Sequence, residues 1–249
     1  MKTHCIIAFL VLLPVTMLAQ TTIETDRPDQ TESPSTVPHN YLQVESGFMY
    51  EKVNREMQSI FHPTVLWRYG LYNNFEFRIQ TDLTTEKSPA DTASGLAPVA
   101  VGFKAKLVEG KKTLPDISFV GHLSISELAS PGLQNRYWAP DFRFLFKHTI
   151  SEKFDISYNL GAEWKGETPD ATALYTLAAN FSGGRRVSVF AEFYGYLNKY
   201  ETTDHRFDVG ATCLITDNFL ADLSVGKGLS QISPDIFVSA GLSYRFHIN

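Results

Sequence analysis

Apolar and polar side chains alternate with a period of two along most of this sequence, and this alternation limits the fold more than any other feature. From Phe75 to Leu83, the odd positions hold Phe, Ile, Thr and Leu, and the even positions hold charged or amide residues. Successive side chains of a β-strand point to opposite faces. The segment is therefore predicted to be a strand with one apolar and one charged face.

The same alternation recurs along the chain in about twelve segments. They cover 41–53, 59–70, 74–85, 96–108, 116–126, 138–150, 154–165, 172–181, 186–197, 205–215, 219–227 and 235–246. Each is close to the ~9–11 residues that a tilted transmembrane strand needs, and bacterial single-chain barrels have even strand numbers. We therefore expect an all-β fold, an antiparallel transmembrane β-barrel of about twelve strands.

The connections between these segments alternate in length. Tight turns rich in Gly, Asn and Asp occur at 72–74, 151–153, 183–185 and 216–218, and longer linkers occur at 85–95, 127–137, 166–171, 198–204 and 228–234. Outer-membrane barrels have short periplasmic turns and longer external loops. The connection lengths therefore predict that both termini lie at the periplasmic end.

A soluble β-sandwich or a lipocalin-like barrel is the alternative, with the apolar face turned into a core. Two features favour the membrane barrel. The polar face carries many charges, which suits a wet lumen, and aromatic residues of the other face lie near strand ends, as in an interface girdle: Tyr50, Trp67, Tyr69, Trp164 and Tyr244. We expect the outer membrane of a Gram-negative cell, with the lipid bilayer as a partner.

The first residues are typical of a secretory signal peptide. Lys2 and His4 precede the apolar run 6–13, and Ala19-Gln20 has the character of a cleavage site. Cys5 would leave with this segment, so the mature chain would keep Cys213 and could form no intramolecular disulfide. We divide the chain into a signal peptide (1–19), a periplasmic leader or plug segment (20–39) and an outer-membrane barrel (40–249).

The leader is polar and rich in proline, and it shows no periodic pattern. Proline removes a backbone donor and is excluded from helix interiors and central strands. The segment is therefore predicted to be extended. Two interpretations remain open: a flexible periplasmic tail, or a plug that tucks into the mouth of the barrel.

Three short motifs resemble those of an outer-membrane family named after the meta-pathway of phenol degradation. The leader reads Glu24-Thr25-Asp26-Arg27-Pro28-Asp29-Gln30-Thr31-Glu32-Ser33-Pro34, and Val37-Pro38 and Gln43-Val44-Glu45-Ser46-Gly47-Phe48 follow. The terminal Gly241-Leu242-Ser243-Tyr244-Arg245-Phe246 is similar to the aromatic signal that the barrel-assembly machinery reads, although three residues follow Phe246. The resemblance implies a transporter or channel and directs attention to apolar or aromatic solutes.

By alternation, a set of charged side chains is expected to line the lumen: Glu45, Arg68, Glu76, Arg78, Asp82, Lys104, Lys106, Arg143, Lys147, Glu163, Glu192, Arg206, Asp208 and Arg245. They could form a selectivity path for a small solute, or they could pair across the lumen and brace the wall. The leader motif Asp26-Arg27-Pro28-Asp29 could pair with them and plug the pore.

We expect a passive channel or transporter for an unidentified small solute. The alternative is a structural or adhesive barrel with a blocked lumen, which the short loops disfavour. A more remote alternative is an outer-membrane lipid hydrolase, since His122 and Ser124 have the spacing of a His-x-Ser pair. The alternation turns both inward, away from lipid, so no catalytic residue and no enzyme activity are expected.

Other function classes find no support in the sequence. The net charge of -5 argues against a nucleic-acid partner. The remaining histidines are scattered, without acidic or Cys neighbours at ligand spacing, so no metal site is expected. No phosphate-binding or dinucleotide motif is present, and no cofactor is expected.

Overall fold

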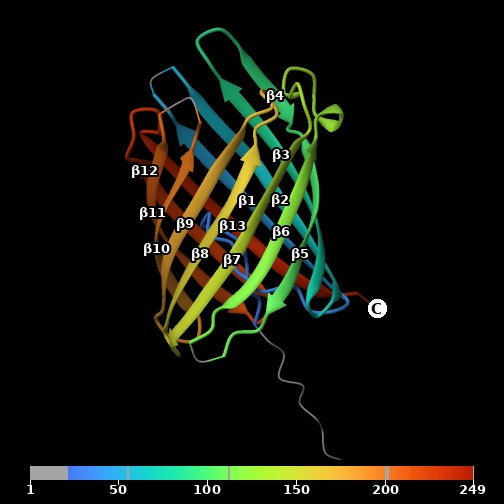
Figure 1. The fold of residues 1–249 in the computed structure, drawn as a ribbon, viewed down its shortest axis with the longest axis vertical. Helices are drawn as coiled ribbons and strands as arrows, with labels where there is room; N and C mark the ends of the chain where they lie inside the picture. The colour runs from blue at the N-terminus through green and yellow to red at the C-terminus, as the bar shows by residue number, and fades with distance from the viewer. Residues whose placement is uncertain (1–21, 55, 112, 200–201, 249) are drawn as a thin grey trace, which may run out of the picture.

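Each strand pairs antiparallel with a sequence neighbour, and the first strand pairs with the last (Figure 1). The computed structural model describes residues 22–54, 56–111, 113–199 and 202–248. Its strands are β1 (Tyr41–Lys52), β2 (Gln58–Tyr72), β3 (Phe75–Lys87), β4 (Thr92–Leu96), β5 (Val99–Val108), β6 (Asp116–Ile125), β7 (Ala139–Ser151), β8 (Phe154–Trp164), β9 (Ala171–Ser182), β10 (Val187–Leu197), β11 (Asp204–Thr216), β12 (Phe219–Gly228) and β13 (Ile236–His247).

Strands β4 and β5 form one interrupted position of the wall. Both pair with β3, β4 along Leu83–Lys87 and β5 along Phe75–Gln80. The interruption falls at Ala97 and Pro98, where proline has no N–H for the ladder. The barrel therefore has twelve wall positions, and the predicted antiparallel barrel of about twelve strands is confirmed. The linker predicted at 85–95 is shorter in the structure, because β3 and β4 continue the hairpin to residues 87 and 92.

The two faces of the wall have opposite chemistry. Leu160 is 52% exposed and Leu223 is 61% exposed, whereas Glu76 and Asn159 on the inner face are fully buried. A water-soluble sandwich would bury the apolar set and expose the charges. Here the apolar face is the outer one, as a lipid-facing barrel requires.

The two ends of the barrel also differ. The end that holds Tyr41 and His247 carries the short connections, apart from the longer one at 109–115, and we call it the turn end. The opposite end, with β4 and most of the longer connections, is the loop end (Figure 1). The 3-10 helix η1 (Ser126–Leu128) lies in one of the loop-end connections. No helix within the described ranges is long and apolar enough to cross a membrane.

The leader, taken from residue 22 to residue 39, runs inside the barrel and not below it (Figure 1). Within it, Ile23, Asp26 and Val37 are at most 7% exposed. The N–H of Ile23 donates to the C=O of Asp217 in the β11–β12 turn, at 2.8 Å. Residues 22–39 therefore lie within the barrel wall. The proposed signal peptide, residues 1–19, lies outside the described residues.

Candidate functional site

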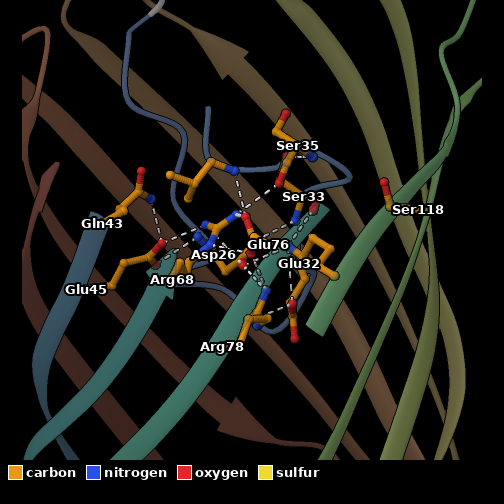
Figure 2. Close-up of polar contacts among 12 residues, drawn as sticks. Asp26, Glu32, Ser33, Ser35, Gln43, Glu45, Arg68, Glu76, Arg78 and Ser118 are labelled. Atoms are coloured by element: carbon orange, nitrogen blue, oxygen red, sulfur yellow. Dashed lines mark hydrogen bonds and ion pairs between the residues drawn. The ribbon is translucent and has the colours of Figure 1, made fainter. Parts of the chain in front are cut away.

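Asp26 of the leader lies among three cations of the barrel wall. Its carboxylate is 2.7 Å from Lys104 Nζ, 2.8 Å from Arg78 Nη1 and 3.2 Å from Arg68 Nη1 (Figure 2). Glu32 of the leader adds ion pairs of 3.1 Å to Arg78 and 3.4 Å to Lys104. We call this group of two leader acids and three wall cations the cation contact. Strands β2, β3 and β5 supply the cations on their inner faces.

Two wall carboxylates complete the cation contact. Arg68 donates to Glu45 at 2.7 Å and to Glu76 at 2.8 Å, and all three side chains are at most 1% exposed. The same carboxylates also accept backbone N–H groups of the leader, Glu45 from Asp26 at 2.9 Å and Glu76 from Val37 at 2.6 Å. The network thus holds both the side chains and the backbone of the leader. Four cations, counting nearby Arg143, face four carboxylates.

The cations stabilise the ionised form of the leader acids. Burial alone would raise the pKa of Glu32, but Arg78 and Lys104 lower it to about 2. Burial likewise opposes ionisation of Asp26, yet Arg68, Lys104 and Arg78 hold the pKa of that carboxyl well below its usual range. Both acids are therefore charged when the leader is docked.

The other side of the leader meets carboxylates in place of cations. Glu192 accepts the N–H of Gln30 at 2.8 Å and the hydroxyl of Thr31. Thr31 also contacts the Thr176 hydroxyl at 2.7 Å. Asp208 is the direct cross-strand partner of Glu192, is 2% exposed, and its Oδ1 has no hydrogen-bond partner among the described residues. We call Asp29, Gln30, Thr31, Glu192 and Asp208 the carboxylate contact.

Asp29 lies near Glu192 and Asp208, and it forms no ion pair with a cation among the described residues. Burial, and then the charges of Glu192 and Asp208, raise the pKa of Asp29 well above its usual range. The docked leader therefore favours an ionised Asp26 and a protonated Asp29, three residues apart.

Further contacts extend around most of the wall. Arg143 donates to the C=O of Gln30 at 3.0 Å, Ser118 to the C=O of Pro34 at 2.5 Å, and the N–H of Glu32 donates to Asn159 at 2.8 Å. With Arg27, which donates to β12 and β13, polar contacts of the leader reach the following strands: β1, β2, β3, β5, β6, β7, β8, β9, β10, β12 and β13. The leader is therefore fixed across the full section of the lumen.

Cavities lie on both sides of this level. At the loop end, one cavity of about 330 Å³ is lined by His122, Asp141, Arg143 and Glu163, and another of about 280 Å³ reaches Met49. At the turn end, a cavity of about 330 Å³ is lined by residues of the β9–β10 turn and of the leader. The leader thus separates a charged loop-end vestibule from a turn-end chamber rich in hydroxyl groups.

The structure places the predicted lumen residues in two groups. Eight of them contact the leader: Glu45, Arg68, Glu76, Arg78, Lys104, Arg143, Lys147 and Glu192. The others lie elsewhere on the wall, and Lys106 is 3.9 Å from Asp116. Asp82 and Glu163 line the loop-end cavities, Arg206 pairs with Glu51 at 2.8 Å and Asp204 at 2.6 Å, Asp208 lies beside Glu192, and Arg245 donates to Asn218 at 3.0 Å.

Several residues that hold the leader did not stand out in the sequence. Asn159, Thr176 and Asp222 occupy strand positions whose side chains face the lumen. The alternation along each strand was therefore the sequence signal that could have identified them. Gly47 and Gly241 also contact the leader, through the absence of a side chain. Of the leader motif Asp26-Arg27-Pro28-Asp29, the two acids lie in different contacts and Arg27 in a third.

His122 and Ser124 both face the loop-end cavity and not lipid. His122 Nδ1 is 3.1 Å from Asp141 Oδ1, and Nε2 is buried without a hydrogen-bond partner among the described residues. A membrane lipid on the outer face cannot reach this pair. No cluster of acidic, His or Cys side chains in the described part of the chain has the arrangement of a metal site.

Comparison with known protein families shows to which family the chain is related. Residues 25–246 match the family described as "Putative MetA-pathway of phenol degradation". The chain belongs to this family. The matched range begins inside the leader and ends in β13, so it includes both the barrel and the segment inside it. A comparison with curated protein sequences returns no match.

Solved structures similar to this family member are outer-membrane barrels. The COG4313 outer membrane channel from Pseudomonas putida F1 has a TM-score of 0.69 and 11% identity, over 85% of this chain and 97% of that one. The KdgM porin has a TM-score of 0.58 and 10% identity, over 82% and 99% of the two chains. At such identities the likeness concerns the fold. Together with the apolar outer face, it identifies the protein as a barrel of the Gram-negative outer membrane, embedded in the lipid bilayer.

Proposed function

We propose that this protein is a passive outer-membrane channel for small solutes, and that residues 22–39 form a plug that controls its lumen. The belt of leader contacts around the wall, with cavities on both sides of it, carries the proposal. A barrel of twelve strands can enclose a lumen, and here the leader occupies the middle of it. Solutes would enter the loop-end vestibule and pass to the turn end where the plug shifts or leaves a gap.

The lumen suggests a class of solute. The family description points to phenol breakdown, and a lumen lined by charged and hydroxyl groups suits solutes with hydrogen-bonding groups. Small hydroxylated aromatic compounds satisfy both conditions. The mixed signs of the lining favour neutral or zwitterionic molecules over strongly charged ones.

Recordings in planar bilayers test the channel and the plug together. Wild-type protein should show small single-channel currents, and a variant that lacks residues 22–38 should show larger ones. A variant with a shortened loop at 229–235 serves as a control, because within the described part of the chain that loop forms no hydrogen bond or ion pair with the leader. Absence of current in both wild type and deletion would favour the structural or adhesive barrel, and equal currents would refute the plug.

Biogenesis adds two smaller proposals. Residues 1–19 would act as a cleaved signal peptide, and residues 241–246 at the end of β13 would be read by the barrel-assembly machinery. Phe246 supports the second, since it is 42% exposed on the outer face of that strand. Replacement of Phe246 by Ala should lower the amount of folded protein in the outer membrane.

A further inference from the structure

A row of four residues runs straight across the seam where the barrel closes. Thr64 of β2 pairs with Gly47 of β1, Gly47 pairs with Gly241 of β13, and Gly241 pairs with Asp222 of β12. The row thus has a polar side chain at each end and two glycines in the middle. The two glycines face each other across the pairing of the first strand with the last.

Arg27 of the leader lies along this row. Its Nη1 donates to Thr64 at 3.3 Å, and its Nη2 and Nε donate to the two oxygens of Asp222 at 3.1 and 3.4 Å. Nη2 also donates to Ser239 of β13 at 2.8 Å. One guanidinium therefore bonds to three strands, β2, β12 and β13, and lies against Gly47 of β1 between them.

The glycines leave the space that the guanidinium fills. A Cβ atom on Gly47 would lie 2.2 Å from Arg27 Cζ and Nη2, and one on Gly241 would lie 2.5 Å from Nε. These separations are far below a van der Waals contact. We call the pair of glycines the seam notch. It exists only when β1 and β13 are paired, because each strand supplies one half of it.

Asp222 shows why the notch selects a cation. Its side chain is fully buried, and Arg27 is its ion-pair partner in the described part of the chain. A buried carboxylate without a partner is strongly unfavourable. Arginine supplies the planar fork that can bond both oxygens, and lysine cannot reproduce this geometry.

We propose that Arg27 is the positioning residue that docks the plug on the completed barrel seam, and that its guanidinium in turn holds the seam closed. The leader can take its final place only after the last strand has paired with the first. The proposal deepens the proposed function, since it names what fixes the plug, but docking can be read without any current through the channel.

Hydrogen exchange of the backbone amides of residues 22–39 provides the test, in the folded full-length protein in detergent. Gly47→Ala expels Arg27 from the notch, and Arg27→Gln removes the charge; loss of these charge-assisted bonds should speed exchange about tenfold or more. Arg27→Lys should give an intermediate rate. Gly121→Ala is the matched control, since a Cβ there meets its nearest atom at 3.4 Å.

A second measurement follows the seam itself. The temperature at which the barrel loses its folded mobility in an SDS gel should fall for Gly47→Ala and Arg27→Gln and stay unchanged for Gly121→Ala. Arg27 is not part of the wall, so Arg27→Gln remains informative if Gly47→Ala does not fold.

The outcomes separate the two proposals. Wild-type exchange in Gly47→Ala would overturn the seam notch, and an effect of Arg27→Gln alone would reduce Arg27 to a counter-charge for Asp222 and also overturn it. Faster exchange in both variants, with no change in current when residues 22–38 are deleted, would support the notch and refute the plug.

Discussion

The two sides of the leader are held by opposite electrostatics. In the cation contact, ionised Asp26 and Glu32 face Arg68, Arg78 and Lys104. In the carboxylate contact, Asp29 faces Glu192 and Asp208, and backbone and hydroxyl donors of the leader satisfy Glu192. The cation contact requires ionised leader acids, whereas the carboxylate contact requires a neutral Asp29. A segment held in this way is fixed firmly only within a limited range of pH. Its docking is stabilised more by the cation contact, the strong side, than by the carboxylate contact, the weak side.

The largest difference between the two sides should come from Asp26→Asn. The substitution removes the carboxylate that three buried cations share. Removal of one partner of a buried ion pair costs ~3–5 kcal/mol of stability. The leader should undock, seen as larger single-channel currents and rapid proteolysis of residues 22–39. Glu24→Gln is the matched control in the same segment. Its side chain is 49% exposed and 3.8 Å from Lys147, so little change is expected.

The corresponding acid-to-amide substitution in the carboxylate contact should have a smaller effect. Glu192→Gln keeps an acceptor for Gln30 or Thr31 and removes one charge from three neighbouring acids, so the expected loss is about 1 kcal/mol. Asp208→Asn should leave docking unchanged or tighter, since Oδ1 of Asp208 has no partner among the described residues. Proteolysis rates of the leader measure both. A loss for Asp208→Asn as large as that for Asp26→Asn would contradict the assignment of a strong and a weak side.

The smallest expected effect is a dependence of docking on pH with two limbs. The lowered pKa of Glu32 stabilises the docked leader above the usual value of 4.5, and this contribution is lost as the pH falls toward about 2. The raised pKa of Asp29 acts in the opposite sense, so its contribution is present at low pH and is lost as the pH rises through that value. Open probability should therefore rise when the pH falls toward about 2 and also when it rises through the raised pKa of Asp29, and Asp29→Asn should remove the second rise alone.

The barrel could be predicted from the sequence because its signal is periodic. Alternation placed the inner and outer faces of twelve strands and set their ends to within a few residues, apart from the longer β3–β4 hairpin. Each strand follows the same physical rule, with lipid on one side and a wet lumen on the other. Charges such as Arg68 and Glu192 could therefore be assigned to the lumen without knowing their partners.

The course of the leader could not be predicted in the same way. Its sequence has no period, and both open interpretations were compatible with a polar, proline-rich segment. Its position depends on pairs far apart in the chain, such as Asp26 with Lys104 and Arg27 with Asp222. The seam notch could not be predicted because Gly47 and Gly241 contribute space and no side chain. The two glycines become neighbours only when β1 pairs with β13 in the closed barrel.

The central claim, that the leader lies in the lumen and controls it, can be tested with one disulfide. Thr31 and Thr176 hydroxyls are 2.7 Å apart, so cysteines at both positions are within reach of a disulfide bond. In a Cys213→Ser background, Thr31→Cys with Thr176→Cys should cross-link in isolated outer membranes and lock the channel in its small-current state until it is reduced. Thr31→Cys with Leu177→Cys, on the lipid face of the same strand, should not cross-link. Absence of the first disulfide, or currents that do not change when it is reduced, would contradict a plug held in the lumen.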